Sequence, residues 1–171
     1  MKDYLLIARE WEAFTMAHDG AIEGSLNAYR IQFTAQINGI SYSALKKLEN
    51  VKGGGGLTDL KPSPYSEKLS VHATIPLQEG CKLMLVKANL FNKLMLFLRG
   101  LKSEHFGSSW LVGSNAACGL SADTFNSITV LPGMRGMRIA ENAFRMRLIA
   151  LPGDEREIKI IHDTVQDVMR R

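Results

Sequence analysis

The feature that most constrains this chain is an Asn38-Gly39 pair between two runs of alternating apolar and polar residues. Before the pair, Tyr29, Ile31 and Phe33 alternate with polar residues, and the run 40–45 alternates in the same way after it. Alternation with a period of two predicts a strand with one buried face. Asn-Gly suits a type I′ turn, which needs positive φ at both central positions. The sequence therefore predicts an antiparallel hairpin here.

The same alternation predicts strands elsewhere in the chain. A strand that ends before Pro76 and one that follows Gly80 are expected to form a second hairpin. A third hairpin is expected across Glu141-Asn142, and two short strands complete the set. The expected strands cover 21–23, 69–75, 81–86, 110–112, 137–140 and 143–151, with a turn over 24–27.

Four segments show the helical spacing of apolar residues instead. Asn89 and Ser121 are residue types that cap helix N-termini. We expect helices over 2–17 and 88–99, from Ser121 to about Leu131, and from Asp154 to about Met169. The second helix has an apolar stripe of Leu90, Leu94, Phe97 and Leu98, and the last helix has an expected buried face of Ile158, Ile161, Val165 and Val168.

These elements together predict one α+β domain over residues 1–171. Antiparallel β hairpins are expected to form one or two sheets, packed on one side against the N-terminal, middle and C-terminal helices. Four consecutive glycines and two prolines predict a mobile Gly/Pro-rich loop at about 51–66.

The chain has 171 residues, a net charge of +4 and 46% hydrophobic residues, a composition typical of a globular domain. No apolar run approaches the roughly 20 residues that span a bilayer, and the N-terminus lacks a signal-peptide pattern. Cys81 and Cys118 have no metal-ligand spacing, so we expect buried thiols, with a disulfide or a reactive thiol as alternatives. We therefore expect a cytoplasmic location, while membership of a larger or membrane-anchored protein stays open.

Four segments carry a resemblance to a known family. They are Gly24 to Phe33, close to G-x-x-x-Y-R-I-x-F with one extra residue, the run CKLMLVKANL, the run FGSSWLVGSN, and a terminal strand followed by an amphipathic helix. In this order they resemble a family of uncharacterised bacterial proteins, a domain of unknown function. The resemblance implies an α+β fold and no activity. Gly107 departs from the pattern, because these proteins carry an aspartate there.

Gly133-Met134-Arg135-Gly136 raises the question of nucleic-acid binding. RNA-binding KH modules hold backbone nucleotides with a Gly-x-x-Gly loop that leads into a helix. Pro132 interrupts any preceding helix, and the strand and helix of such a module do not fit around this segment. A connection between a helix and a strand is therefore the favoured interpretation.

Four arginines form the candidate anion-binding site. Arg145 and Arg147 share one face of a predicted strand, and Arg135 and Arg138 precede them on its expected partner. A solvated outer face, or an edge protected against pairing, is the structural alternative. A patch that binds phosphate, anionic lipid or an acidic partner is the functional one.

The sequence shows no pattern typical of a metal site or of a catalytic nucleophile. The four histidines, His18, His72, His105 and His162, lack metal-pair spacing, and the serines near glycine do not form a nucleophile elbow. We expect no cofactor, no metal site and no catalytic residue.

We predict a non-enzymatic binding or assembly module of a bacterial cell, whose partner is another protein or a second copy of the chain. The first alternative is a weak binder of nucleic acid or another polyanion through the Arg135–Arg147 region. The second is an enzyme of a type that the sequence does not identify. Substrate, partner identity, oligomeric state and pathway stay open.

Overall fold

The computed structural model describes residues 4–27, 30–47, 67–75, 80–115 and 120–170. Within them the chain forms nine strands and four helices, an α+β fold as predicted. The predicted loop at 51–66 lies outside the described residues, as does Tyr29. The elements are α1 (Tyr4–Ala17), β1 (Ala21–Asn27), β2 (Arg30–Ile37), β3 (Ile40–Lys47), β4 (Glu67–Thr74), β5 (Lys82–Lys87), α2 (Leu90–Leu98), β6 (Lys102–Phe106), β7 (Trp110–Ser114), α3 (Ala122–Thr129), β8 (Met134–Ala140), β9 (Ala143–Leu148) and α4 (Glu155–Met169).

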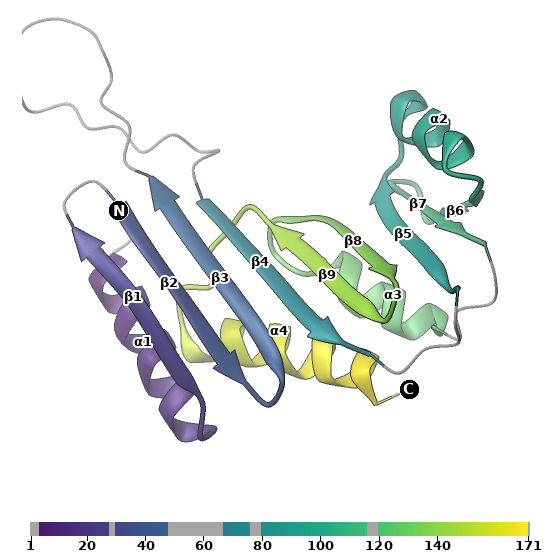
Figure 1. Cartoon of the computed structure of the whole chain (residues 1–171). Coiled ribbons are helices and arrows are strands. Elements are labelled where there is room, and N and C mark those ends of the chain that lie inside the picture. The colour runs from purple at the N-terminus through teal and green to yellow at the C-terminus, as the bar shows by residue number, and fades with distance from the viewer. Residues whose placement is uncertain (1–3, 28–29, 48–66, 76–79, 116–119, 171) are drawn as a thin grey trace, which may run out of the picture.

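All nine strands form one antiparallel sheet in the order β1-β2-β3-β4-β9-β8-β5-β7-β6 (Figure 1). The β2–β3 hairpin turns at Asn38-Gly39 with positive φ at both residues, as predicted. Ile31 and Phe33 are buried, which confirms the predicted inward face at these two positions. The β8–β9 hairpin turns at Glu141-Asn142, again with positive φ at both residues.

The predicted hairpin of β4 with β5 is wrong. β4 pairs with β3 and β9, whereas β5 pairs with β7 and β8. The β8–β9 hairpin, which comes much later in the chain, lies between them. Alternation determines which side chains of a strand face the core, but it does not determine which strand becomes the neighbour.

Two further strand predictions need correction. The segment 24–27, expected as a turn, continues β1 along β2, and Gly24 pairs with Phe33. A Cβ on Gly24 would lie 2.6 Å from Phe33 Cβ, so the absence of a side chain permits this close approach. β6 was not predicted, because its outward positions are mostly charged or polar and its alternation is weak.

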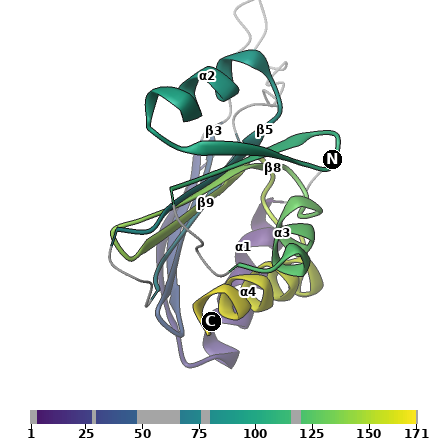
Figure 2. The ribbon, with the colours of Figure 1, turned by 90° about the vertical axis from the view of Figure 1, so that its right-hand side faces the viewer.

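Helices α1, α3 and α4 cover one face of the sheet and enclose the main core (Figure 2). Trp11, Tyr42, Phe144 and Ile158 are among its fully buried side chains. α2 packs on the opposite face, over β5, β6 and β7. The expectation that all helices lie on one side is therefore wrong for α2. We call the face that lacks α1, α3 and α4 the open face.

The alternation along β5 explains how two cores form. Leu83 and Leu85 belong to the main core, whereas Met84 and Val86 point the other way, toward α2. A second, small core of Leu96, Leu101 and Leu111 lies there. The side chains of β5 thus contribute to apolar clusters on both faces of the sheet. The cluster that holds α2 is separate from the main core.

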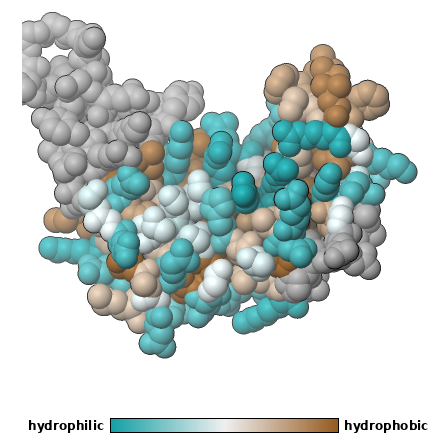
Figure 3. Space-filling view, viewed as in Figure 1, coloured by the Kyte–Doolittle hydropathy of each residue, from teal (hydrophilic) through white to brown (hydrophobic). Residues whose placement is uncertain are grey.

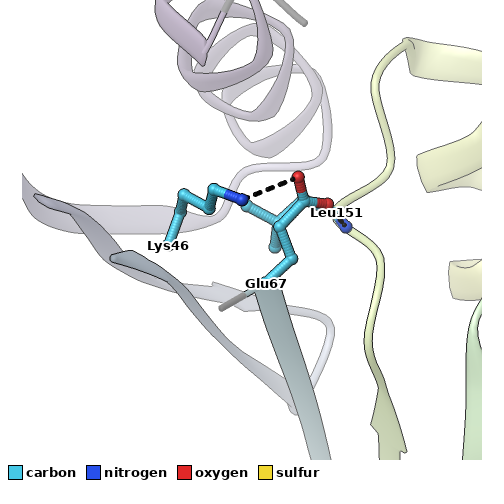
Figure 4. A network of polar contacts seen from close by, with 3 residues as sticks. All are labelled: Lys46, Glu67 and Leu151. Carbon is cyan, nitrogen blue, oxygen red and sulfur yellow. Dashed lines mark hydrogen bonds and ion pairs between the residues drawn. The ribbon is translucent and has the colours of Figure 1, made fainter. Parts of the chain in front are cut away.

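A buried ion pair joins β3 and β4 to the segment before α4. Lys46 Nζ lies 3.4 Å from Glu67 Oε1, and Glu67 Oε2 accepts a hydrogen bond from the Leu151 backbone N–H at 3.2 Å (Figure 4). Lys46 is 2% exposed, so removing either partner would leave a buried charge without its counter-charge. This contact holds the segment between β9 and α4 against β3 and β4.

Candidate functional site

Three of the four candidate arginines meet on the open face. Arg138 on β8 lies directly opposite Arg145 on β9, and His72 on β4 lies on the other side of Arg145. Arg147 occupies the next outward position of β9, opposite Gly136 and Ser70. All three arginines are exposed, because Phe144, Met146 and Leu148 take the inward positions of β9.

We call Arg138, Arg145 and Arg147, with Lys68 and Lys82 at outward positions of β4 and β5, the cationic face. The outward positions of β4, β9, β8 and β5 hold no carboxylate. Among the described residues no ion pair involves these arginines, since the one that is seen joins Lys46 and Glu67. Hydrophilic side chains dominate this side of the sheet in Figure 3.

The arrangement is electrostatically unfavourable for the protein alone. Like charges directly opposite each other on neighbouring antiparallel strands destabilise a sheet. The positive charge also acts on His72. The pKa of its imidazole is lowered mainly by partial burial and secondly by the charge of Arg145. An anion bound across the strands would offset the repulsion between Arg138 and Arg145.

A cavity of about 350 Å³ adjoins the cationic face where the C-terminal end of α2 approaches β8. Its lining includes Arg99, which directly follows α2, Arg138 from β8 and Lys82 from β5, with Glu141 as the single carboxylate. Met84 also lines the cavity, and its sulfur accepts a hydrogen bond from Arg99 Nη1 at 3.5 Å. Three cations therefore surround a space large enough for a phosphate group.

Arg135, the fourth candidate arginine, has no partner residue on β9 in the strand register, unlike Arg138. It lies at the β-bulge between Met134 and Gly136, where pairing with β9 shifts by one residue. The Gly133–Gly136 segment is not a loop that leads into a helix, because Met134 already begins β8. The KH-like interpretation is therefore wrong. Gly133 makes the turn before the strand with φ +69°, and its missing side chain leaves room for the Ala150 backbone.

A second polar cluster lies inside the main core. His162 on α4 is 1% exposed, and its Nδ1 lies 2.7 Å from Tyr42 Oη. Its Nε2 lies 3.0 Å from Gln166 Nε2 and 3.4 Å from Asn38 Nδ2. Sequence reasoning missed the burial of His162, although its position one residue after Ile161 places it beside the buried face of α4.

The protonation state of His162 follows from its partners. Gln166 Oε1 accepts a hydrogen bond from Arg170, so the Gln166 amide N–H donates to His162 Nε2. The ring proton then lies on Nδ1, which donates to Tyr42 Oη. Burial, then the nearby His18, lower the pKa of His162, while Asp163 acts in the opposite direction. Burial likewise raises the pKa of Tyr42 far above its ordinary value. Both shifts favour the neutral forms of His162 and Tyr42.

Other candidate chemistry remains dispersed. Within the described residues, no group of three or more His, Cys, Asp or Glu side chains is placed to hold a metal ion. Ser108 and Ser109 contact each other through their hydroxyls at 3.4 Å on the β6–β7 turn. Cys81 is disulfide-bonded, so the expectation of a free thiol is wrong for this residue. Cys118 lies outside the described residues.

None of the helices in the described part of the chain has both the length and the apolar character needed to cross a bilayer. The chain matches no protein-family model and no curated protein sequence. Among solved structures it is similar to the mycobacterial trehalose monomycolate transport factor A, TtfA, with a TM-score of 0.47 and 11% sequence identity over 96% of this chain and 93% of that chain. Similarity at this level carries no argument about function.

Proposed function

We propose that the chain is a non-enzymatic binding module that holds an anionic, phosphate-bearing partner on its open face. The observation that carries the proposal is the direct opposition of Arg138 and Arg145 with no carboxylate at the surrounding outward positions. Arg147 extends the same charge along β9. Guanidinium groups on neighbouring strands can bind one phosphate or carboxylate through paired N–H donors.

Location within the sheet supports a binding role over protection of an edge. β8 and β9 lie in the middle of the nine-stranded sheet, flanked by β4 and β5. Charged residues that prevent edge-to-edge pairing are needed at the outermost strands, which are β1 and β6 here. The cationic face therefore has no protective role at an edge.

Heparin, used as a polyanionic probe, tests the proposal. Arg145→Glu/Arg147→Glu should elute from a heparin column at clearly lower salt than the unmodified protein, because each lost phosphate-like contact reduces counterion release. The matched control is Arg9→Glu/Lys159→Glu, which changes net charge equally through exposed residues of α1 and α4. Equal elution of the two variants would overturn the proposal, since net charge alone would then explain retention.

The cellular compartment stays a prediction. A cytoplasmic location was expected from sequence, whereas the disulfide at Cys81 is typical of an oxidising compartment. We infer that the protein functions outside the reducing cytoplasm. Thiol alkylation of the native protein, taken directly from cells, tests this inference, because reactive cysteines would contradict it.

A further inference from the structure

The apolar stripe of α2 does not face the core. Only Leu96 of this helix is buried. The predicted stripe is instead in contact with solvent, together with a second phenylalanine. We call the following five residues the apolar surface of α2: Leu90 (85% exposed), Phe91 (69%), Leu94 (53%), Phe97 (75%) and Leu98 (69%).

This exposure does not result from a poorly attached helix. Leu96 packs with Leu101 and Leu111, and a Cβ on Gly113 would lie 2.5 Å from a Leu96 methyl group. Asn89 caps the helix by accepting a hydrogen bond from the Asn92 N–H at 2.7 Å. A docked, capped helix therefore presents its apolar side away from the protein. Figure 3 shows the hydrophobic side chains gathered on α2, above the hydrophilic part of the open face.

The charges around α2 indicate what covers this surface. Between positions 88 and 103 the sequence holds three cationic residues, Lys93, Arg99 and Lys102, and no aspartate or glutamate. Lys93 and Lys102 line a hollow of about 590 Å³ together with Leu90, Leu94 and Phe97. Arg99 follows the helix at its C-terminal end. Apolar side chains bordered by cations match a bilayer surface, with acyl chains beneath anionic phosphate headgroups.

The composition favours lipid over two other occupants. Single-stranded nucleic acid binds to aromatic platforms, but three of the five exposed side chains are leucines, which cannot stack with bases. A second copy of the chain would bring the same cations of α2 against each other, because a twofold contact places identical surfaces together. With nine residues, α2 is about 14 Å long, too short to span a bilayer but long enough to lie within its interface.

We propose that α2 is a membrane-contact helix, which inserts its apolar surface into a bilayer containing anionic phospholipid while Lys93, Arg99 and Lys102 contact the headgroup phosphates. α2 and the cationic face lie on the same side of the sheet, so both can face one membrane. The inference goes beyond the proposed anion binding and does not depend on it. It rests on the apolar surface and on the charges of α2 itself.

Flotation with vesicles tests the proposal on the full chain. The unmodified protein should float with vesicles of phosphatidylcholine and phosphatidylglycerol, and less with phosphatidylcholine alone. Phe91→Ser/Phe97→Ser should bind the mixed vesicles at least about tenfold more weakly, because each phenylalanine loses its transfer into the acyl region. The control Met16→Ser/Val130→Ser removes two exposed apolar side chains from α1 and the end of α3, and should bind as the unmodified protein does.

A second measurement reports insertion directly. Tryptophan fluorescence of Phe97→Trp should shift to the blue on addition of mixed vesicles, and that of Met16→Trp should not shift. The native tryptophans give a common background, since Trp11 and Trp110 are both buried. Unchanged circular dichroism of the serine variants shows that they fold.

Three results would overturn the proposal. The first is failure of the unmodified protein to float, and the second is unchanged flotation of Phe91→Ser/Phe97→Ser. The third is an unmodified protein that forms a dimer and binds no vesicles, together with a serine variant that is monomeric, because the apolar surface of α2 would then be a dimer interface. If flotation is lost in Arg145→Glu/Arg147→Glu but not in Phe91→Ser/Phe97→Ser, the insertion of α2 is contradicted and the proposed anion binding is supported. Conversely, equal heparin elution of the two charge-reversal variants leaves this test unaffected.

Discussion

At the scale of single residues, His162 shows how hydrogen-bond partners set a protonation state. Its Nε2 receives amide donors from Gln166 and Asn38, so a proton added there would face N–H groups and not an acceptor. Asn38 belongs to the β2–β3 turn, and His162 belongs to α4. A turn predicted from sequence therefore acquires a tertiary contact that sequence does not reveal.

Protonation of His162 should reduce stability. Its folded-state pKa lies below the unfolded value of 6.5, so the folded state binds fewer protons between the two values. The contribution is complete above pH 6.5 and is lost as the pH falls through the folded pKa. We expect the free energy of unfolding, measured with urea, to decrease as the pH is lowered from 7.5 through 6.5 toward the folded pKa. The decrease should be smaller in His162→Gln.

His72, whose pKa is also lowered, leaves a residual slope in that variant. The unmodified protein, measured in the same series of buffers, gives the full slope for comparison. An unchanged slope in His162→Gln would show that the histidine is not responsible.

At the scale of elements, α2 differs from the other helices in how it is attached. The buried faces of α3 and α4 belong to the main core, whereas a small cluster around Leu96 holds α2. Elements with few buried apolar contacts open locally at low free energy. We therefore expect α2, although it is docked and capped, to open at a lower free energy than α3 and α4.

Leu96→Ala should release α2 selectively. Truncation of a buried leucine removes about 2–5 kcal/mol of packing, and here that loss acts on one helix. We expect faster amide hydrogen exchange over Leu90–Leu98, with little change in the urea midpoint of the molecule. Ile158→Ala in α4 is the contrasting variant, since it should lower that midpoint. Equal effects of the two substitutions would show that α2 folds together with the main core.

At the scale of the whole molecule, the sheet places side chains from distant parts of the sequence in one row. His72, Arg145, Arg138 and Met84 lie in successive strands, although β4 and β5 come before α2 and β8 and β9 come after it. The insertion of the β8–β9 hairpin between β4 and β5 creates this row. The open face thus gains its charge from topology.

Arg138→Gln should stabilise the protein while weakening its binding to anions. Removing one of two opposed like charges is expected to raise the free energy of unfolding by a few tenths of a kcal/mol in low salt. The gain should disappear at high salt, which screens exposed charges. Urea unfolding at both salt concentrations measures the gain, and heparin elution measures the loss of binding. A lower stability in low salt would contradict the repulsion argued for this face.

The sequence by itself determined the local elements and most inward-facing residues. Positive φ at Asn38-Gly39, the Ser121 cap and the burial of Ile158, Ile161 and Val165 follow from local backbone preference and from periodicity, which act over a few residues. The pairing of Arg145 and Arg147 on one outward face was predictable for the same reason.

Only the tertiary structure decided which strands became neighbours and which apolar stripe faced solvent. Periodicity predicts the apolar stripe of α2 but cannot distinguish a stripe that faces the core from one that faces solvent, as Phe97 and Leu98 do. The opposition of Arg138 to Arg145 depends on register, and the row that they form with His72 and Met84 depends on strand order. Those contacts join segments far apart in the chain, and their free energy exists only once the whole sheet is formed.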